Sequence, residues 1–103
     1  MVVFFYFSAM HTVYIIYSPS IDKYYIGETV DAQGRLERHN SKHYEQSYTR
    51  QADDWSLKLV LYCEDILHAK RIEKHIKSMK SRVYIENLIS YSEMQHKLIS
   101  RFR

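Results

Sequence analysis

The chain has few of the residues that cross-link small exported domains or interrupt regular structure. Among 103 residues there are one cysteine, Cys63, one proline, Pro19, and two glycines. A lone cysteine cannot form an internal disulfide, and the common Cys-rich zinc patterns are absent from the sequence. No apolar run reaches the ~20 residues that a membrane-spanning helix needs. We therefore expect a cytoplasmic domain that does not enter a membrane, with Cys63 in the core rather than acting as a nucleophile.

The first ten residues, MVVFFYFSAM, are apolar but have no basic residue ahead of the apolar stretch. They therefore do not match a secretory signal. Two interpretations of residues 1–10 remain open: an extra edge strand, or a leader that precedes a working start at Met10. We favour the leader, because MHTVYIIYS begins a strand cleanly.

The length suits one compact domain, and an apolar content of 46% is enough for one core. Two β-branched and aromatic runs, TVYIIYS and KYYIGET, flank PSID and predict a hairpin. The patterns that follow predict a helix that begins near Asp31, a polar loop over 41–54, a strand over 55–64, a helix that begins at Asp65, and one or two helices towards the end. The expected fold is α+β, a three-stranded antiparallel sheet flanked by helices in the order β-β-α-β-α-α.

Positive charge is concentrated in residues 68–82, HAKRIEKHIKSMKSR. This segment has one acidic residue, Glu73, and a net charge of +5, because it contains Lys70, Arg71, Lys74, Lys77, Lys80 and Arg82. A localised basic stripe is typical of a protein that binds a polyanion. The alternative is an ordinary solvated helix face.

Five polar or aromatic residues fall at positions where the predicted elements could bring them together. Tyr14 and Tyr25 lie on the two hairpin strands, Arg35 and His39 are one helical turn apart, and Glu73 lies at the edge of an apolar stripe. Each has an ordinary structural interpretation alone: strand aromatics, an exposed pair, and a surface ion pair. Together they supply what phosphodiester hydrolysis needs: a way to activate water, a carboxylate for a metal ion, and a cation for the phosphate.

The order and spacing of these residues resemble a known family, the GIY-YIG endonucleases. Thr12-Val13-Tyr14 and Tyr25-Ile26-Gly27 resemble its paired signature, although Thr-Val replaces Gly-Ile at two positions of strand backbone and packing. GRLERHN resembles the helix that follows, and RIEKHIKSMKSR resembles the helix with the metal-binding glutamate. The resemblance covers about residues 11–89, as in small members similar to the nuclease domain of UvrC. Residues 90–103 would then form a C-terminal helical tail.

The resemblance implies a role for each residue of the constellation. Tyr14 would help to deprotonate the attacking water, and Tyr25 would orient water or phosphate. Arg35 would bind the scissile phosphate through its forked guanidinium. His39 would assist the base or donate to the phosphate. Glu73 would hold one Mg²⁺ or Mn²⁺ ion, and we expect no small-molecule cofactor.

The expected function is a divalent-metal-dependent endonuclease that cuts DNA according to its structure, in repair or recombination. The DNA would be bound by Lys70, Lys74, Lys77, Lys80 and Asn87, the last as the candidate for the family's late asparagine. One alternative is a nucleic-acid-binding module that does not cut, since tyrosines can also stack on bases. Another is an interaction domain that docks a protein through its tyrosine-rich face.

Overall fold

The structure is a computed structural model that describes residues 10–42 and 47–103. Within these residues the elements follow the predicted order, with two helices at the end and one additional short 3₁₀ helix. They are β1 (Thr12–Ser18), β2 (Lys23–Thr29), α2 (Ala32–Asn40), η1 (Tyr48–Gln51), β3 (Ser56–Tyr62), α3 (Ile66–Met79), α4 (Arg82–Ser90) and α5 (Ser92–Arg101). The predicted α+β class and element order are confirmed. The possible strand or leader over residues 1–10 lies almost entirely outside the described residues.

The three strands form one antiparallel sheet in the order β2-β1-β3. β1 is therefore central, and its side chains are covered on both faces. In the pairing with β2, Tyr14 lies opposite Gly27. β2 is an edge strand, so one of its sides is open to further contacts.

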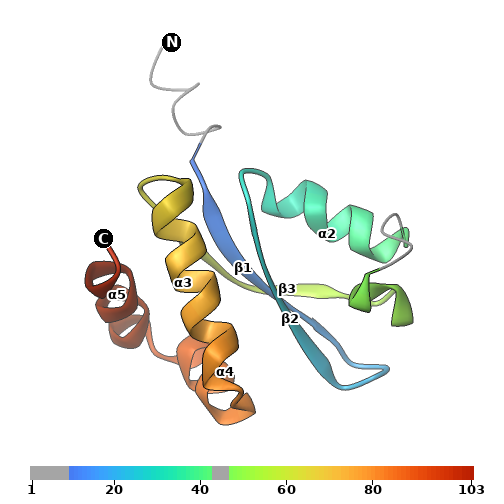
Figure 1. Ribbon diagram of the computed structural model, residues 1–103. Helices are drawn as coiled ribbons and strands as arrows, with labels where there is room; N and C mark the ends of the chain where they lie inside the picture. The colour runs from blue at the N-terminus through green and yellow to red at the C-terminus, as the bar shows by residue number, and fades with distance from the viewer. Residues whose placement is uncertain (1–9, 43–46) are drawn as a thin grey trace.

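Helices cover both faces of the sheet, with α3, α4 and α5 on one side and α2 on the other (Figure 1). Alternation along β1 supplies both cores, because successive strand residues point to opposite faces. Val13 and Ile15 belong to the core that includes Ile72 of α3. Tyr14 and Ile16 belong to a second core with Trp55, against which Leu36 of α2 packs. The tyrosine thus lies on the α2 face of the sheet.

The helices begin where the sequence predicts because capping side chains accept their first free N–H groups. The Asp31 carboxylate accepts from the Gly34 N–H at 3.0 Å, and the Asp65 carboxylate accepts from the His68 N–H at 2.8 Å. Both predicted helix starts are confirmed. At the other end of α3, Lys80 adopts a left-handed conformation with φ of 47°, which stops the helix.

The segment 41–54 is more than the polar loop expected from its lack of periodicity. It includes η1, and within it Thr49 and Ala52 are buried. The predicted strand 55–64 is also shorter, because Trp55 lies in the second core and its indole N–H donates to the Thr49 carbonyl at 2.9 Å. The backbone N–H of Trp55 donates to the side-chain oxygen of Asn40, and the side-chain N–H of Asn40 donates to the Trp55 carbonyl. Tertiary packing around one tryptophan therefore organises the loop.

Two further expectations concern the core and the membrane. Cys63 is buried in the first core, and burial raises the pKa of its thiol to about 11, which suits a packing role. In the part of the chain that the structure describes, the helices are too short or too polar to cross a bilayer.

Candidate active site

Tyr14 lies in the second core, with its ring laid across the neighbouring strand. Its side chain is only 1% exposed. A Cβ atom placed on Gly27 would come within 2.4 Å of the Tyr14 hydroxyl oxygen and 2.5 Å of its Cζ atom. Only glycine leaves room for this ring opposite it in the sheet. The glycine of the YIG run thereby positions the first tyrosine.

His39 lies on the last turn of α2, and both of its ring nitrogens have partners. Nε2 is 2.9 Å from the Tyr14 hydroxyl oxygen, and Nδ1 is 2.6 Å from Oγ1 of Thr49 on η1. The residue is 2% exposed. Burial first, and the positive charge of Arg35 second, lower the pKa of His39 to about 4. The imidazole is therefore neutral at physiological pH, and its unprotonated ring nitrogen accepts a hydrogen bond.

Tyr25 completes an aromatic group around these two residues. Its ring centroid is 5.2 Å from that of His39, in an edge-on arrangement, and 6.4 Å from that of Tyr14. The ring of Tyr48 is stacked with that of Tyr25, with the two centroids 6.4 Å apart. Tyr25 is only partly buried, so it forms the boundary between the buried Tyr14–His39 pair and the surface.

Arg35 is half-buried on α2, one turn before His39. Residues four apart on a helix share a face, and the effect of Arg35 on the pKa of His39 shows that its charge acts on the ring. The guanidinium thus contributes positive potential beside the tyrosine pair. A phosphate bound beside the two tyrosines would need a cation at this position to pair with its oxygens.

Glu73 reaches the same group from α3 through one lysine. Its side chain is 15% exposed, and Oε2 accepts from the Lys77 ammonium at 3.0 Å. The Lys77 Nζ atom is 6.0 Å from the centroid of the Tyr25 ring. Tyr25 belongs to the α2 face of the sheet, whereas α3 covers the opposite face. The two halves of the constellation therefore meet around the edge strand β2.

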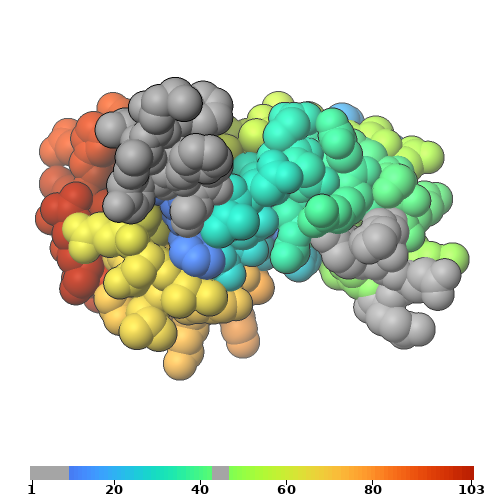
Figure 2. Space-filling view, turned by 90° about the horizontal axis from the view of Figure 1, so that it is seen from above, coloured from blue at the N-terminus to red at the C-terminus, as the bar shows by residue number. Residues whose placement is uncertain are grey.

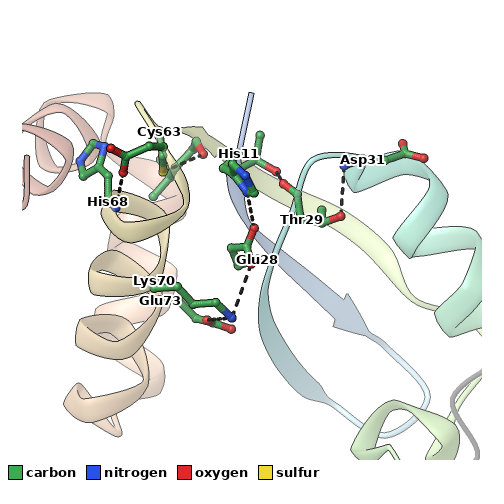
Figure 3. A network of polar contacts seen from close by, with 11 residues as sticks. His11, Glu28, Thr29, Asp31, Cys63, His68, Lys70 and Glu73 are labelled. Atoms are coloured by element: carbon green, nitrogen blue, oxygen red, sulfur yellow. Dashed lines mark hydrogen bonds and ion pairs between the residues drawn. The ribbon is translucent and has the colours of Figure 1, made fainter. Parts of the chain in front are cut away.

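Glu28 is a second carboxylate beside Glu73 that the sequence analysis did not select. It comes from β2, is 10% exposed, and binds Nδ1 of His11 at 2.7 Å. The Lys70 ammonium lies between the two carboxylates, 3.5 Å from Glu28 and 3.9 Å from Glu73 (Figure 3). Strand alternation was an available signal, because Glu28 falls on the same face as the buried Ile26.

The Glu73 carboxylate, as a metal ligand, fits a weakly held, hydrated divalent ion. Within residues 10–42 and 47–103, no three His, Cys, Asp or Glu side chains group as a metal site. A single carboxylate is nevertheless a suitable hard ligand for Mg²⁺ or Mn²⁺, since Mg²⁺ keeps several waters and adds substrate phosphate oxygens. Lys70 and Lys77 already neutralise Glu73, so an ion at this carboxylate competes with two ammonium groups.

The basic residues of 68–82 do not form one continuous stripe. Arg82 binds the carbonyl and the carboxylate of Asp22 at the hairpin tip, and the Arg71 guanidinium donates to the Phe102 carbonyl. Three lysines at helix-neighbour spacing share a face of α3 with Glu73: Lys70, Lys74 and Lys77. Lys80 follows at the end of the helix, and its surface neighbours include Tyr48 and Arg82. Asn87 is exposed on α4.

The start of β1 emerges between α3 and α2 in a view from above (Figure 2). These two helices, Ala32–Asn40 and Ile66–Met79, are far apart in the sequence. Direct contacts join Tyr14, Tyr25 and His39, and Glu73 joins them through Lys77. Thr49, which sequence reasoning also missed, holds His39 from η1, and no periodicity in its segment could have indicated it.

Comparison with known proteins agrees with this geometry. Residues 10–86, most of the chain, match the family model of the GIY-YIG catalytic domain. No curated protein and no solved structure matches the chain. The matched range contains both tyrosine strands, α2 and α3, and the sequence resemblance is thereby confirmed. With a nuclease fold and the two tyrosines of its signature side by side, this chain belongs to the GIY-YIG catalytic domain family.

Proposed function

We propose that the chain is a divalent-metal-dependent endonuclease that hydrolyses DNA phosphodiester bonds, in the cytoplasm, at sites selected by DNA structure during repair or recombination. The observation that carries the proposal is the buried hydrogen bond between Tyr14 and His39. It sits beside Tyr25, whose ring contacts the lysine that holds Glu73. A phenol hydrogen-bonded to a neutral imidazole, with a carboxylate linked to this pair through a lysine and a second tyrosine, is a combination suited to activating water beside a bound phosphate.

The mechanism begins with the proton of the attacking water. A phenol in water has a pKa of about 10, so Tyr14 cannot act as a base unless its own proton has an acceptor. His39 Nε2, at 2.9 Å, is that acceptor in the proposed scheme. Tyr14 takes the water proton while it passes its own proton to the imidazole. Tyr25, at the boundary with solvent, orients the water or the phosphate.

The phosphate is held by cations from both sides of the site. Arg35 binds its oxygens from α2 with a planar fork, and Lys77 approaches from α3. Lys70, Lys74 and Lys80, with Asn87, bind the flanking DNA backbone. A Mg²⁺ or Mn²⁺ ion held by Glu73 would supply charge stabilisation on the phosphate oxygens and acidify a bound water.

The test is incubation of the protein with branched, flapped and plain duplex DNA, in Mg²⁺ or Mn²⁺ and in EDTA. We expect metal-dependent products, with more cleavage of branched or flapped DNA. Tyr14→Phe removes one oxygen and is expected to slow single-turnover cleavage by about 10²- to 10⁴-fold, the range for general base catalysis. Glu73→Gln is expected to abolish metal-dependent cleavage.

Tyr17→Phe is the matched control for the tyrosine substitution. Tyr17 is on the same strand, but its hydroxyl donates to Asp22 at the hairpin tip rather than bonding to His39. We expect this variant to cleave normally. Cleavage by Tyr14→Phe at the control rate would remove the phenol from the mechanism. DNA binding without products in either metal would instead identify a non-cleaving nucleic-acid-binding module.

A further inference from the structure

The imidazole of His39 has a hydroxyl partner at each ring nitrogen. These two partners determine which nitrogen carries the proton, that is, the tautomer of the ring. A neutral histidine has one N–H, so one ring nitrogen donates and the other accepts. The Tyr14 hydroxyl at Nε2 and the Thr49 hydroxyl at Nδ1 can each donate or accept. Only one tautomer allows Nε2 to receive a proton from Tyr14. The partner of Nδ1 therefore matters for chemistry at the opposite nitrogen.

Thr49 is fixed in place by contacts that do not depend on the histidine. It is 1% exposed, and its carbonyl accepts from the Trp55 indole N–H at 2.9 Å. Its own backbone N–H donates to Oγ of Ser47 at 3.2 Å, and the two hydroxyl oxygens lie 3.0 Å apart. Ser47 thereby offers an acceptor for the hydroxyl proton of Thr49. The threonine oxygen can then accept from the ring.

The relative acidity of the two hydroxyl groups favours one arrangement. A phenol, with a pKa of about 10, is a much stronger acid than an aliphatic alcohol, and the stronger acid is the better donor to the basic ring nitrogen. Tyr14 then donates to Nε2, and Nδ1 carries the proton that points to Thr49. Nδ1 and Oγ1 lie 2.6 Å apart, within hydrogen-bond distance.

We propose that Thr49 is a positioning residue that accepts the Nδ1 proton of His39 and so keeps Nε2 as the acceptor for the hydroxyl proton of Tyr14. Its catalytic consequence rests on the proposed nuclease function. When Tyr14 takes a proton from water, its own proton moves to Nε2. The resulting imidazolium keeps its Nδ1–H on Thr49, and no proton is gained or lost by the relay itself. Thr49 touches neither water nor phosphate in this scheme.

The first test reads the tautomer directly and needs no cleavage. In ¹⁵N-labelled protein at neutral pH, long-range ¹H–¹⁵N correlations separate protonated from unprotonated ring nitrogens, and loss of signals in His39→Gln assigns the ring. We expect Nδ1 to be protonated and Nε2 unprotonated in the wild type. Thr49→Ser keeps the hydroxyl and should keep this pattern. Thr49→Val has nearly the same shape without the hydroxyl and should shift population towards protonated Nε2.

A wild-type ring protonated on Nε2 would overturn the proposal. So would a Thr49→Val ring whose signals match the wild type in a variant with a native amide spectrum. If the valine variant loses its native spectrum, Ser47→Ala serves instead, because it removes the acceptor of the threonine proton. A reduced Nδ1-protonated population is then expected, and an unchanged one contradicts the proposal.

The second test connects the tautomer to catalysis through a double-mutant cycle. By analogy with partners that orient metal-bound histidines, we expect Thr49→Val to slow single-turnover cleavage by about 10- to 100-fold. Thr49→Ser should restore most of the rate. In a His39→Gln background the valine substitution should cost nothing further, because the groups act as a unit. An equal loss in both backgrounds would show a merely structural role. Absence of cleavage in every protein, with the expected ring signals, would remove the nuclease function and leave the tautomer assignment standing.

Discussion

At the scale of single residues, the site depends on a contact that only glycine permits. Tyr14 and Gly27 are opposite each other in the sheet, and the phenol ring occupies the space that a side chain at Gly27 would fill. The hydroxyl is thereby directed at His39. The two runs of the family signature are thus one packing unit, in which the second run makes room for the tyrosine of the first.

We predict that Gly27→Ala destabilises the protein by about 1–3 kcal/mol, the usual cost of overpacking a well-filled core. The new methyl group must displace a ring that is only 1% exposed, and urea unfolding measures the change. Gly34→Ala is the control, because it adds the same methyl group but places it against the Asp31 side chain rather than against the buried Tyr14 ring. A weakened cap and a better helix former then offset each other to within about 1 kcal/mol. Equal costs at both glycines would contradict the packing account.

The pKa of His39 predicts how stability changes with pH. The ring binds a proton near pH 6.5 in the unfolded chain but only at about pH 4 in the folded protein. Between these values the unfolded state holds more protons, so stability is complete above about pH 6.5 and falls as pH decreases towards 4. The loss is up to about 3 kcal/mol for a shift of this size.

We therefore expect the free energy of unfolding to fall more steeply over this pH window in the wild type than in His39→Gln. Chemical denaturation at several pH values gives the comparison, and other titrating groups contribute equally to both proteins. Parallel profiles would show that the ring is not held neutral. A phosphate bound to Arg35 would offset the second cause of the shift, so substrate should make the ring more basic.

At the scale of elements, the sequence predicted the helices and strands well but not the binding partners of the basic side chains. Periodicity and caps define α2 and α3 because these signals are local, and Asp31 and Asp65 fall where the helices begin. The binding partner of Arg82 depends on contacts between residues far apart in the sequence. Arg82 binds Asp22, sixty residues earlier, and its guanidinium lies over the Tyr24 ring at 5.2 Å. Similarly, Thr49 becomes important only because Trp55 and His39 are brought to it.

We predict that an exposed lysine of α3 and the hairpin-bound Arg82 contribute differently to the salt dependence of DNA binding. Lys74 is exposed on α3, and Lys74→Gln should reduce the slope of log K against log salt by about 1, as expected when one phosphate contact is lost. Arg82→Gln removes the same charge from the hairpin contact and should leave the slope unchanged. Fluorescence anisotropy at several salt concentrations provides both slopes. A reduced slope in the arginine variant alone would place the DNA on the hairpin side.

At the scale of the whole molecule, the site is built around the edge of a sheet rather than inside one core. The tyrosines and His39 belong to the α2 face, while Glu73 and its lysines come from the opposite layer. Lys77 joins the two halves through the Tyr25 ring. Sequence spacing and the family resemblance selected Tyr14, Tyr25, Arg35, His39 and Glu73, and the catalytic roles of these residues stay predictions. The arrangement around β2 was not predictable, because it depends on how α3 packs across the sheet.

The most direct test of the central claim is to locate a bound divalent ion by paramagnetic broadening. Substoichiometric Mn²⁺ is added to ¹⁵N-labelled protein in the presence of uncleaved DNA, and the loss of each amide signal is recorded. We expect broadening centred on α3 around Glu73 and extending to β2 around Glu28 and Tyr25, and we expect Glu73→Gln to abolish it. Broadening that survives in that variant, or that centres on the hairpin tip or α5, would contradict a single site shared by the carboxylate and the tyrosines.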